Sequence, residues 1–211
     1  MSFNESLIKS KEKIARLFKD KKSKKNENER IPPGQHLTEK FPVLDLGIQP
    51  DFDPKTYKLK VSGLVEKEIE FTYDKILKMP SKEINEDYSC VTHWSKLDVK
   101  WKGVPFKEFL KIVKPKENWK YLIQYGMDGY STNVPREDLE KENVIIAYEL
   151  EGKPIPREHG WPIRIIIPQL YGWKSSKFLN ALKFVDKDEP GFWEVRGYHN
   201  HGNIWDEERY S

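Results

Sequence analysis

Residues 88–95 form the stretch whose side chains are best suited to chemistry. It contains Cys90, the only cysteine of the 211-residue sequence, and His93 follows three positions later. A thiolate is a soft ligand for a transition metal, or a nucleophile where its pKa is lowered. His93 could activate such a nucleophile, as in Cys–His hydrolases, although the spacing assigns no third partner. The simpler alternative is a buried structural thiol, because free cysteine is among the most buried residue types.

A second candidate region is basic and begins at Arg164, which interrupts an otherwise apolar run of isoleucines. A buried guanidinium is costly unless it is paired. Its partner is either a carboxylate of the protein or a phosphate of a ligand, which arginine can bind through two parallel hydrogen bonds. The segment from Tyr171 to Lys177 follows, and its glycine, two serines and two lysines could cradle an anion. The spacing of a Walker loop is absent.

Two further polar segments carry weaker signals. Residues 128–133 (DGYSTN) indicate a turn followed by hydroxyl side chains, which form either a solvated hairpin loop or the wall of a pocket. His199 and His201 lie near the acidic residues 206–208. Histidines two positions apart cannot share one face of a helix, and no second metal-binding pair accompanies them, so a metal site there is disfavoured.

The elements that position these residues follow from the hydrophobic periodicity. The chain is long enough for one core, so we expect one domain with a tail. Alternating apolar residues predict strands centred on 57–61, 69–71, 99–101, 121–125, 144–150, 163–167 and 184–185. Helical spacing predicts helices at 73–78, 105–113 and 178–182. About seven strands among short helices, with no repeat and no regular βαβ alternation, indicate a mixed α+β fold.

The two ends of the chain differ in character. Residues 1–30 carry ten Lys/Arg and five Asp/Glu, whereas residues 31–211 carry a slight negative excess, so charge does not suggest nucleic-acid binding by the body. Residues 7–18 have helical spacing, and residues 19–30 contain no apolar residue and should be a mobile linker. The helix packs on the body or on a second copy, or touches an anionic membrane surface. The aromatic stretch 190–211 should fold back over the body.

Composition also limits the compartment and the class of protein. Charged residues make up 34% of the sequence, and no apolar run is long enough to cross a bilayer. The N-terminal stretch lacks the apolar core of a secretory signal. A single cysteine excludes an internal disulfide and fits a reducing compartment, so we expect a cytoplasmic protein.

Taken together, these segments resemble the sulfite-oxidase-type molybdopterin domain over residues 31–211. Seven blocks in the same order carry the resemblance: 41–57 (FPVLDLGIQPDFDPKTY), 90–95 (CVTHWS), 101–105 (WKGVP), 128–135 (DGYSTNVP), 147–154 (AYELEGKP), 159–164 (HGWPIR) and 171–177 (YGWKSSK). The resemblance implies a mixed α+β domain around one molybdopterin that bears molybdenum, with tungsten as an alternative. It implies two-electron oxygen-atom transfer on a small sulfite-, sulfoxide- or N-oxide-like substrate.

The resemblance also assigns residues. It makes Cys90 the metal ligand and Tyr130 a catalytic residue near the metal. The remaining matches are cofactor-binding positions: Phe41, Val43, Leu44, Ser131, Thr132, His159, Arg164, Ser175, Ser176 and Lys177. True sulfite oxidases have an arginine soon after the cysteine, whereas residues 92–94 here are Thr-His-Trp, a pattern closer to the bacterial sulfoxide-reductase branch.

The matched blocks include no haem domain and no C-terminal dimerisation domain, so we expect electrons to pass to or from a separate protein. The oligomeric state stays open. The alternative from another class is a non-enzymatic module that binds a pterin or another anion on the same scaffold.

Overall fold

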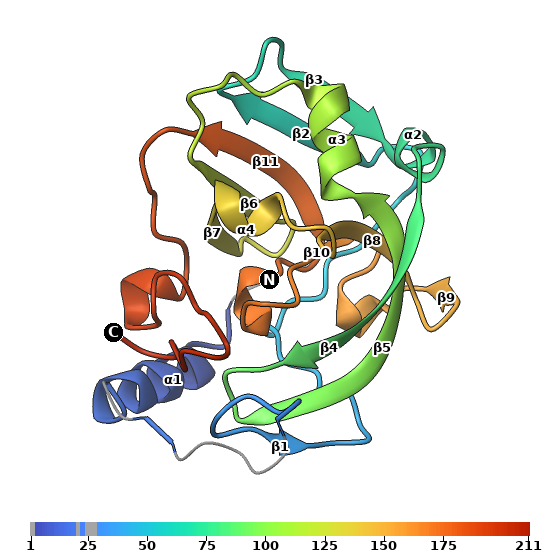
Figure 1. Cartoon of the computed structure of the whole chain (residues 1–211). Coiled ribbons are helices and arrows are strands. Elements are labelled where there is room, and N and C mark those ends of the chain that lie inside the picture. Colours follow the sequence, from blue (N-terminus) through green and yellow to red (C-terminus); the bar gives the residue numbers. More distant parts are fainter. Residues whose placement is uncertain (1–2, 20–21, 24–28) are drawn as a thin grey trace.

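Two β-sheets build the body of the protein (Figure 1). The computed structural model describes residues 3–19, 22–23 and 29–211. The first sheet contains β1 (His36–Leu37), β4 (Lys82–Ser89), β5 (Trp94–Pro105), β8 (Ile145–Leu150), β9 (Lys153–Pro154) and β10 (Arg164–Ile166). The second has the order β3 (Ile69–Thr72), β2 (Lys58–Gly63), β11 (Leu179–Val185), β6 (Tyr121–Gly126), β7 (Ser131–Pro135).

Short helices join the strands. They are α1 (Glu5–Leu17), α2 (Tyr73–Leu77), α3 (Phe106–Val113), α4 (Arg136–Leu139) and the 3₁₀ turns η1 (Arg157–His159), η2 (Gly172–Lys174) and η3 (Glu194–Arg196). The predicted mixed α+β class is confirmed, with more and shorter strands in the described residues than periodicity alone indicated. Pro105, predicted as the first helical residue, is the N-cap of α3.

The predicted helix at 178–182 is wrong, because this segment forms strand β11. Leu179 and Leu182 are both fully buried at a spacing of three, which imitates a helix. A register shift between Leu179 and Ala181, in the pairing with β6, explains why both side chains point inward. β11 also pairs in parallel with β2, where a Cβ on Gly63 would meet the Phe184 carbonyl oxygen at 2.2 Å. Only glycine fits this close approach between the strands.

The predicted N-terminal helix is present as α1, and it packs on the body. Asn4 caps it by accepting a hydrogen bond from Leu7 N, and Ile8 and Ala15 are buried. Leu17 remains exposed, so the buried stripe is narrower than the sequence pattern indicated. The predicted linker at 19–30 lies mostly outside the described residues.

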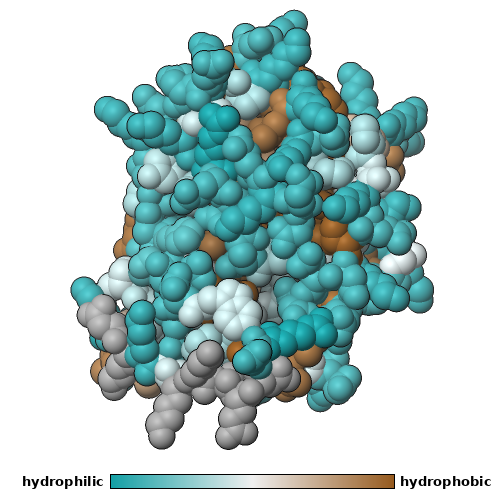
Figure 2. Space-filling view, in the orientation of Figure 1, coloured by the Kyte–Doolittle hydropathy of each residue, from teal (hydrophilic) through white to brown (hydrophobic). Residues whose placement is uncertain are grey.

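The aromatic C-terminal stretch folds back as predicted. Trp193 and Tyr198 are buried and stack at 4.9 Å, whereas Trp205 is 49% exposed. Figure 1 shows α1 beside this C-terminal segment, so the two ends of the chain meet on one side of the body. The face drawn in Figure 2 is largely hydrophilic. Within the described residues, no helix combines the length and apolarity needed to span a membrane.

Candidate active site

One cavity of about 100 Å³ joins the region of the cysteine to the basic region. Eight of the residues predicted as site residues line it: Phe41, Leu44, Cys90, Tyr130, His159, Arg164, Ser175 and Lys177. They come from segments up to 136 positions apart, and the two sheets and their loops bring them together. Most of the predicted site residues are therefore grouped around one cavity, as the resemblance to the molybdopterin domain required.

Cys90 lies in the tight turn between β4 and β5. The turn is closed by hydrogen bonds from Cys90 N to Trp94 O (2.9 Å) and from His93 N to Cys90 O (3.2 Å). Thr92 Oγ1 donates to the sulfur at 3.2 Å, and the residue is 8% exposed. The sulfur is buried, but it lines the cavity rather than a sealed apolar core.

His93 does not form a dyad with this cysteine. Its side chain is exposed, and Nδ1 lies 2.8 Å from the carbonyl oxygen of Gly34. Burial of part of the ring, together with the Arg209 charge, lowers the pKa of His93. A hydrolytic Cys–His pair therefore has no support in the geometry.

Arg164, at the start of β10, is buried without an acidic partner. Its guanidinium donates to His159 O (2.9 Å), Tyr88 Oη (3.0 Å) and Ser175 O (3.0 Å). Among the described residues no carboxylate forms an ion pair with it, and its buried Nε has no hydrogen-bond partner. Of the two partners that the sequence left open, an internal carboxylate is thus excluded for the described part of the chain.

Lys177 resembles Arg164 in its surroundings. Its ammonium donates to the carbonyl oxygens of Leu44 (3.0 Å) and Glu158 (2.8 Å), and no ion pair to it is present in the described regions. Burial and the Arg164 charge lower the pKa of Lys177 to about 8. Two cations that face one cavity, a buried Arg164 and a partly buried Lys177, and that lack an ion-pair partner within the described residues favour the binding of an anion.

Lys174, in the same segment, has a different role. It is fully buried, and its ammonium lies 2.7 Å from the Glu194 carboxylate and 3.0 Å from the Asn133 carbonyl. This buried ion pair fixes η2 to the C-terminal segment. Of the two lysines predicted around the anion cradle, only Lys177 lines the cavity.

His159 lies within electrostatic reach of both Lys177 and Arg164. Burial, reinforced by the charges of Lys177 and Arg164, lowers the pKa of His159 to about 4. The ring is therefore neutral near pH 7, and it packs against Phe41 with ring centroids 4.6 Å apart. A neutral imidazole at this point can donate or accept a hydrogen bond to a bound ligand.

Tyr130 and Asp128 form the wall near Cys90. The Tyr130 hydroxyl donates to the Trp173 carbonyl, and burial raises the pKa of Tyr130 well above its usual range, so the phenol stays protonated. The Asp128 carboxylate accepts a hydrogen bond from Tyr130 N at 3.1 Å. Burial raises the pKa of Asp128 to about 6, so this carboxyl group can take up a proton close to neutral pH.

Four predicted site residues lie outside the lining of the cavity. Val43 is 42% exposed, and Ser131 is only partly buried on β7. Thr132 is buried and donates to Glu194 at 2.8 Å, whereas the Ser176 hydroxyl donates to the Lys177 carbonyl. In this structure Thr132 and Ser176 support the walls rather than face the cavity.

Several lining residues were not predicted as site residues. They are Lys11, Asp45, Tyr88, Trp94, Asp128, Trp193 and Tyr198. Tyr88, Trp94 and Asp128 lie inside segments that the sequence analysis had already identified, so the sequence could have indicated them as site residues. Lys11 had no such signal, because its place depends on how α1 packs.

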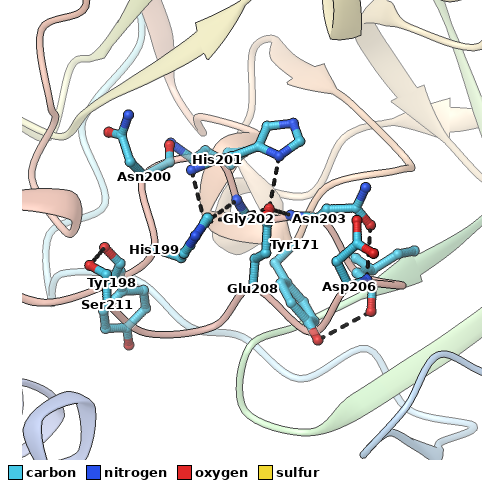
Figure 3. Close-up of polar contacts among 12 residues, drawn as sticks. Tyr171, Tyr198, His199, Asn200, His201, Gly202, Asn203, Asp206, Glu208 and Ser211 are labelled. Carbon is cyan, nitrogen blue, oxygen red and sulfur yellow. Dashed lines mark hydrogen bonds and ion pairs between the residues drawn. The ribbon is translucent and has the colours of Figure 1, made fainter. Parts of the chain in front are cut away.

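His199 and His201 do not form a metal site. Figure 3 shows them on the C-terminal loop, with the His201 ring hydrogen-bonded to Glu208 and the His199 ring to the backbone of His201 and Gly202. His201 Nε2 also lies 2.7 Å from the Asp138 carboxylate. Among the described residues, no group of three or more His, Cys, Asp or Glu side chains could hold a metal ion.

Comparison with known proteins defines the class. The sequence family described as "Oxidoreductase molybdopterin binding domain" matches residues 46–193. An uncharacterized oxidoreductase of Bacillus subtilis, YuiH, is 36% identical over 92% of this chain and 99% of its own length. The catalytic subunit MsrP of a protein-methionine-sulfoxide reductase from Xanthomonas campestris is 33% identical over 65% of this chain, and this chain covers 47% of that subunit.

A structural comparison gives the same fold. The sulfane dehydrogenase SoxCD of Paracoccus pantotrophus superposes with a TM-score of 0.61 at 22% identity, over 74% of this chain and 46% of that one. This chain thus spans nearly all of the Bacillus protein but about half of the MsrP subunit. Fold and site together define a molybdopterin-dependent oxidoreductase.

The chain belongs to the molybdopterin-binding oxidoreductase family, which confirms the resemblance, including its sulfoxide-reductase-like branch. The residues present fit the cofactor. A soft sulfur donor in the lining of the cavity suits a metal, and Arg164 and Lys177 in the same lining suit a phosphate. The unpartnered Nε of Arg164 is a donor that such a phosphate could satisfy.

Proposed function

We propose that the protein is a molybdenum enzyme that transfers an oxygen atom to or from a small sulfur- or nitrogen-oxide substrate. The observation that carries the proposal is one cavity lined both by Cys90 and by two cations, Arg164 and Lys177, that form no ion pair within the described residues. Tungsten is the alternative metal. Similarity to proteins named methionine-sulfoxide reductases favours a sulfoxide as the oxidised substrate.

Each residue has a proposed task. Cys90 binds the metal, while Arg164, Lys177 and His159 bind the phosphate and pterin of the cofactor. The metal-bearing cofactor supplies the two-electron oxygen-atom chemistry. The protonated Tyr130 hydroxyl, which donates to the Trp173 carbonyl, would turn from that carbonyl to orient a substrate oxygen, and Asp128 is placed beside it to hold a proton.

In the reducing direction, one sulfoxide, two electrons and two protons give one sulfide and one water. The electrons come from a separate redox protein, as the "subunit" names of the MsrP and YedZ1 relatives suggest for those proteins. A cytoplasmic location remains the prediction drawn from the single cysteine.

The test is to purify the protein from a host that makes molybdopterin. Elemental analysis for molybdenum and tungsten, and the fluorescence of the oxidised pterin, should show about one cofactor per chain. Reduced viologen dye should support sulfoxide reduction, and Cys90→Ser should lower kcat by at least about 100-fold, because the metal loses its protein ligand. Ser81→Ala, at an exposed position, is the control.

Two results would contradict the proposal. Pterin bound without any oxygen-atom transfer would favour the non-enzymatic binding module. Equal turnover by the wild type and Cys90→Ser would remove the proposed metal ligand.

A further inference from the structure

A third cation, Lys11, lines the same cavity and comes from the N-terminal helix. Helix α1 is firmly attached to the body. Asn4 N donates to Leu46 O at 3.1 Å, Ala15 is buried, and Arg196 forms an ion pair with Glu12 at 3.2 Å. Lys11 is therefore presented to the cavity by an anchored helix.

The ammonium of Lys11 has no polar partner in the described part of the chain. No hydrogen bond and no ion pair to it is present there, and the ammonium lies over the ring of Trp193, 5.0 Å from the centroid. Burial lowers the pKa of Lys11, which the nearby groups of Cys90 and Asp45 oppose. Lys9 and Lys13 on the same helix are exposed, so burial distinguishes Lys11 from its neighbours.

Lys11 comes from α1, a helix that supplies none of the residues proposed to hold the cofactor. Ile8 and Ala15 of its helix pack in one apolar cluster with Cys90, Tyr130 and Trp193. Cys90 and Asp45 act electrostatically on the Lys11 ammonium, and the same two groups also act on Lys177. Lys11 also lies outside residues 46–193, the part shared with the family.

We propose that Lys11 is a substrate-binding residue that recognises a carboxylate or oxyanion on the substrate. The inference rests on the proposed function, because it assigns a substrate class to the same site. A cation that lines the cavity with Cys90, and that forms no hydrogen bond or ion pair within the described residues, would form a charge-assisted hydrogen bond with such a group. The enzyme should therefore prefer anionic substrates to neutral ones of the same reacting group.

The first test compares two sulfoxides on the holoenzyme. N-acetylmethionine sulfoxide carries a carboxylate, whereas its amide is neutral. Lys11→Met should raise KM for the carboxylate by about tenfold or more, and should leave kcat for both compounds and KM for the amide unchanged. Lys11→Arg should restore KM, and Lys13→Met should behave like the wild type because that lysine is exposed.

The second test needs no turnover. Calorimetric titration of the holoenzyme with inorganic sulfate should give a Kd that Lys11→Met weakens by about tenfold and that Lys13→Met does not change. Urea unfolding of the variants checks that α1 still packs. Equal sulfate binding by Lys11→Met and Lys13→Met would overturn the inference.

The remaining outcomes separate this inference from the proposed function. Loss of pterin and molybdenum from Lys11→Met would make Lys11 a cofactor ligand and would also overturn the substrate assignment. A wild-type protein without pterin or turnover would overturn the proposed function. In that case, sulfate binding that depends on Lys11 would still support the anion subsite.

Discussion

Lys174 is fully buried and Lys177, three residues later, is partly buried, and the two side chains serve different purposes. Lys174 is neutralised by Glu194 at 2.7 Å, whereas Lys177 is held only by carbonyl oxygens and faces the cavity. Their sequence context is nearly the same. The difference arises from what the fold places opposite each ammonium group.

Substitution of these two lysines should separate stability from cofactor binding. Lys174→Met leaves the Glu194 carboxylate buried and unpaired, so urea unfolding should show a loss of about 3–5 kcal/mol. Lys177→Met removes an uncompensated cation and should cost less stability, while the pterin content of the purified protein falls. A larger stability loss for Lys177→Met than for Lys174→Met would contradict this assignment.

The sequence identified those site residues whose own type and immediate sequence context indicate their role. Arg164 stood out because a charge in an isoleucine run must have a partner, and Cys90 because it is unique. Lys11 could not be found in this way, since any of several lysines on an amphipathic helix could face the body. Only the packing of Ile8 and Ala15 decides which one does.

At the scale of elements, the prediction of secondary structure failed where strand pairing overrides the local spacing of apolar residues. Leu179 and Leu182 have helical spacing, but the register shift in β11 turns both inward. Long-range pairing with β2 and β6 decides this segment, and no local pattern contains that information. By contrast, strand β2 follows the simple alternation that predicted it, whereas β6 and β8 are present as predicted but are buried on both faces.

The C-terminal segment offers a pH-dependent test. His201 joins it to α4 and to its own loop through Asp138 (2.7 Å) and Glu208 (2.8 Å). The hydrogen bond to Asp138 is the main cause that raises the pKa of His201 above its usual value. The stabilisation is thus fully present below about pH 6.5, the unfolded pKa, and is lost as pH rises through the folded pKa.

His201→Asn should therefore lower the free energy of unfolding by about 1 kcal/mol at pH 5.5, and by clearly less at pH 9. Denaturant unfolding at both pH values measures the difference. His36→Asn is the matched control, because His36 is exposed. If the loss of unfolding free energy in His201→Asn grew with pH, the hydrogen bond between His201 and Asp138 would not be its cause.

At the scale of the whole molecule, both ends of the chain contribute to one cavity. Lys11 comes from α1, and Trp193 and Tyr198 come from the C-terminal segment, while the first sheet supplies Arg164 and the turn that contains Cys90. The blocks between residues 41 and 177 predicted the shared scaffold. They did not predict how the ends complete it, because docking of the ends depends on surfaces that form only after the body has folded.

Inorganic phosphate should stabilise cofactor-free protein, because it can neutralise Arg164 and Lys177. At about 100 times its Kd, a ligand specific for the folded state adds about 2.7 kcal/mol, which a thermal melt detects as a higher Tm. Sodium chloride at equal ionic strength should have a smaller effect. The double variant Arg164→Met/Lys177→Met should lose the response to phosphate; if it keeps the response, phosphate binds elsewhere.

The same two cations also bear on how long the chain survives inside a cell. A chain that has not acquired its cofactor keeps buried positive charges without counterions, and so it opens more often. Proteases degrade the opened population. Cells short of the pterin should therefore accumulate less of this protein at an unchanged rate of synthesis, so that the abundance of the enzyme follows the supply of its cofactor.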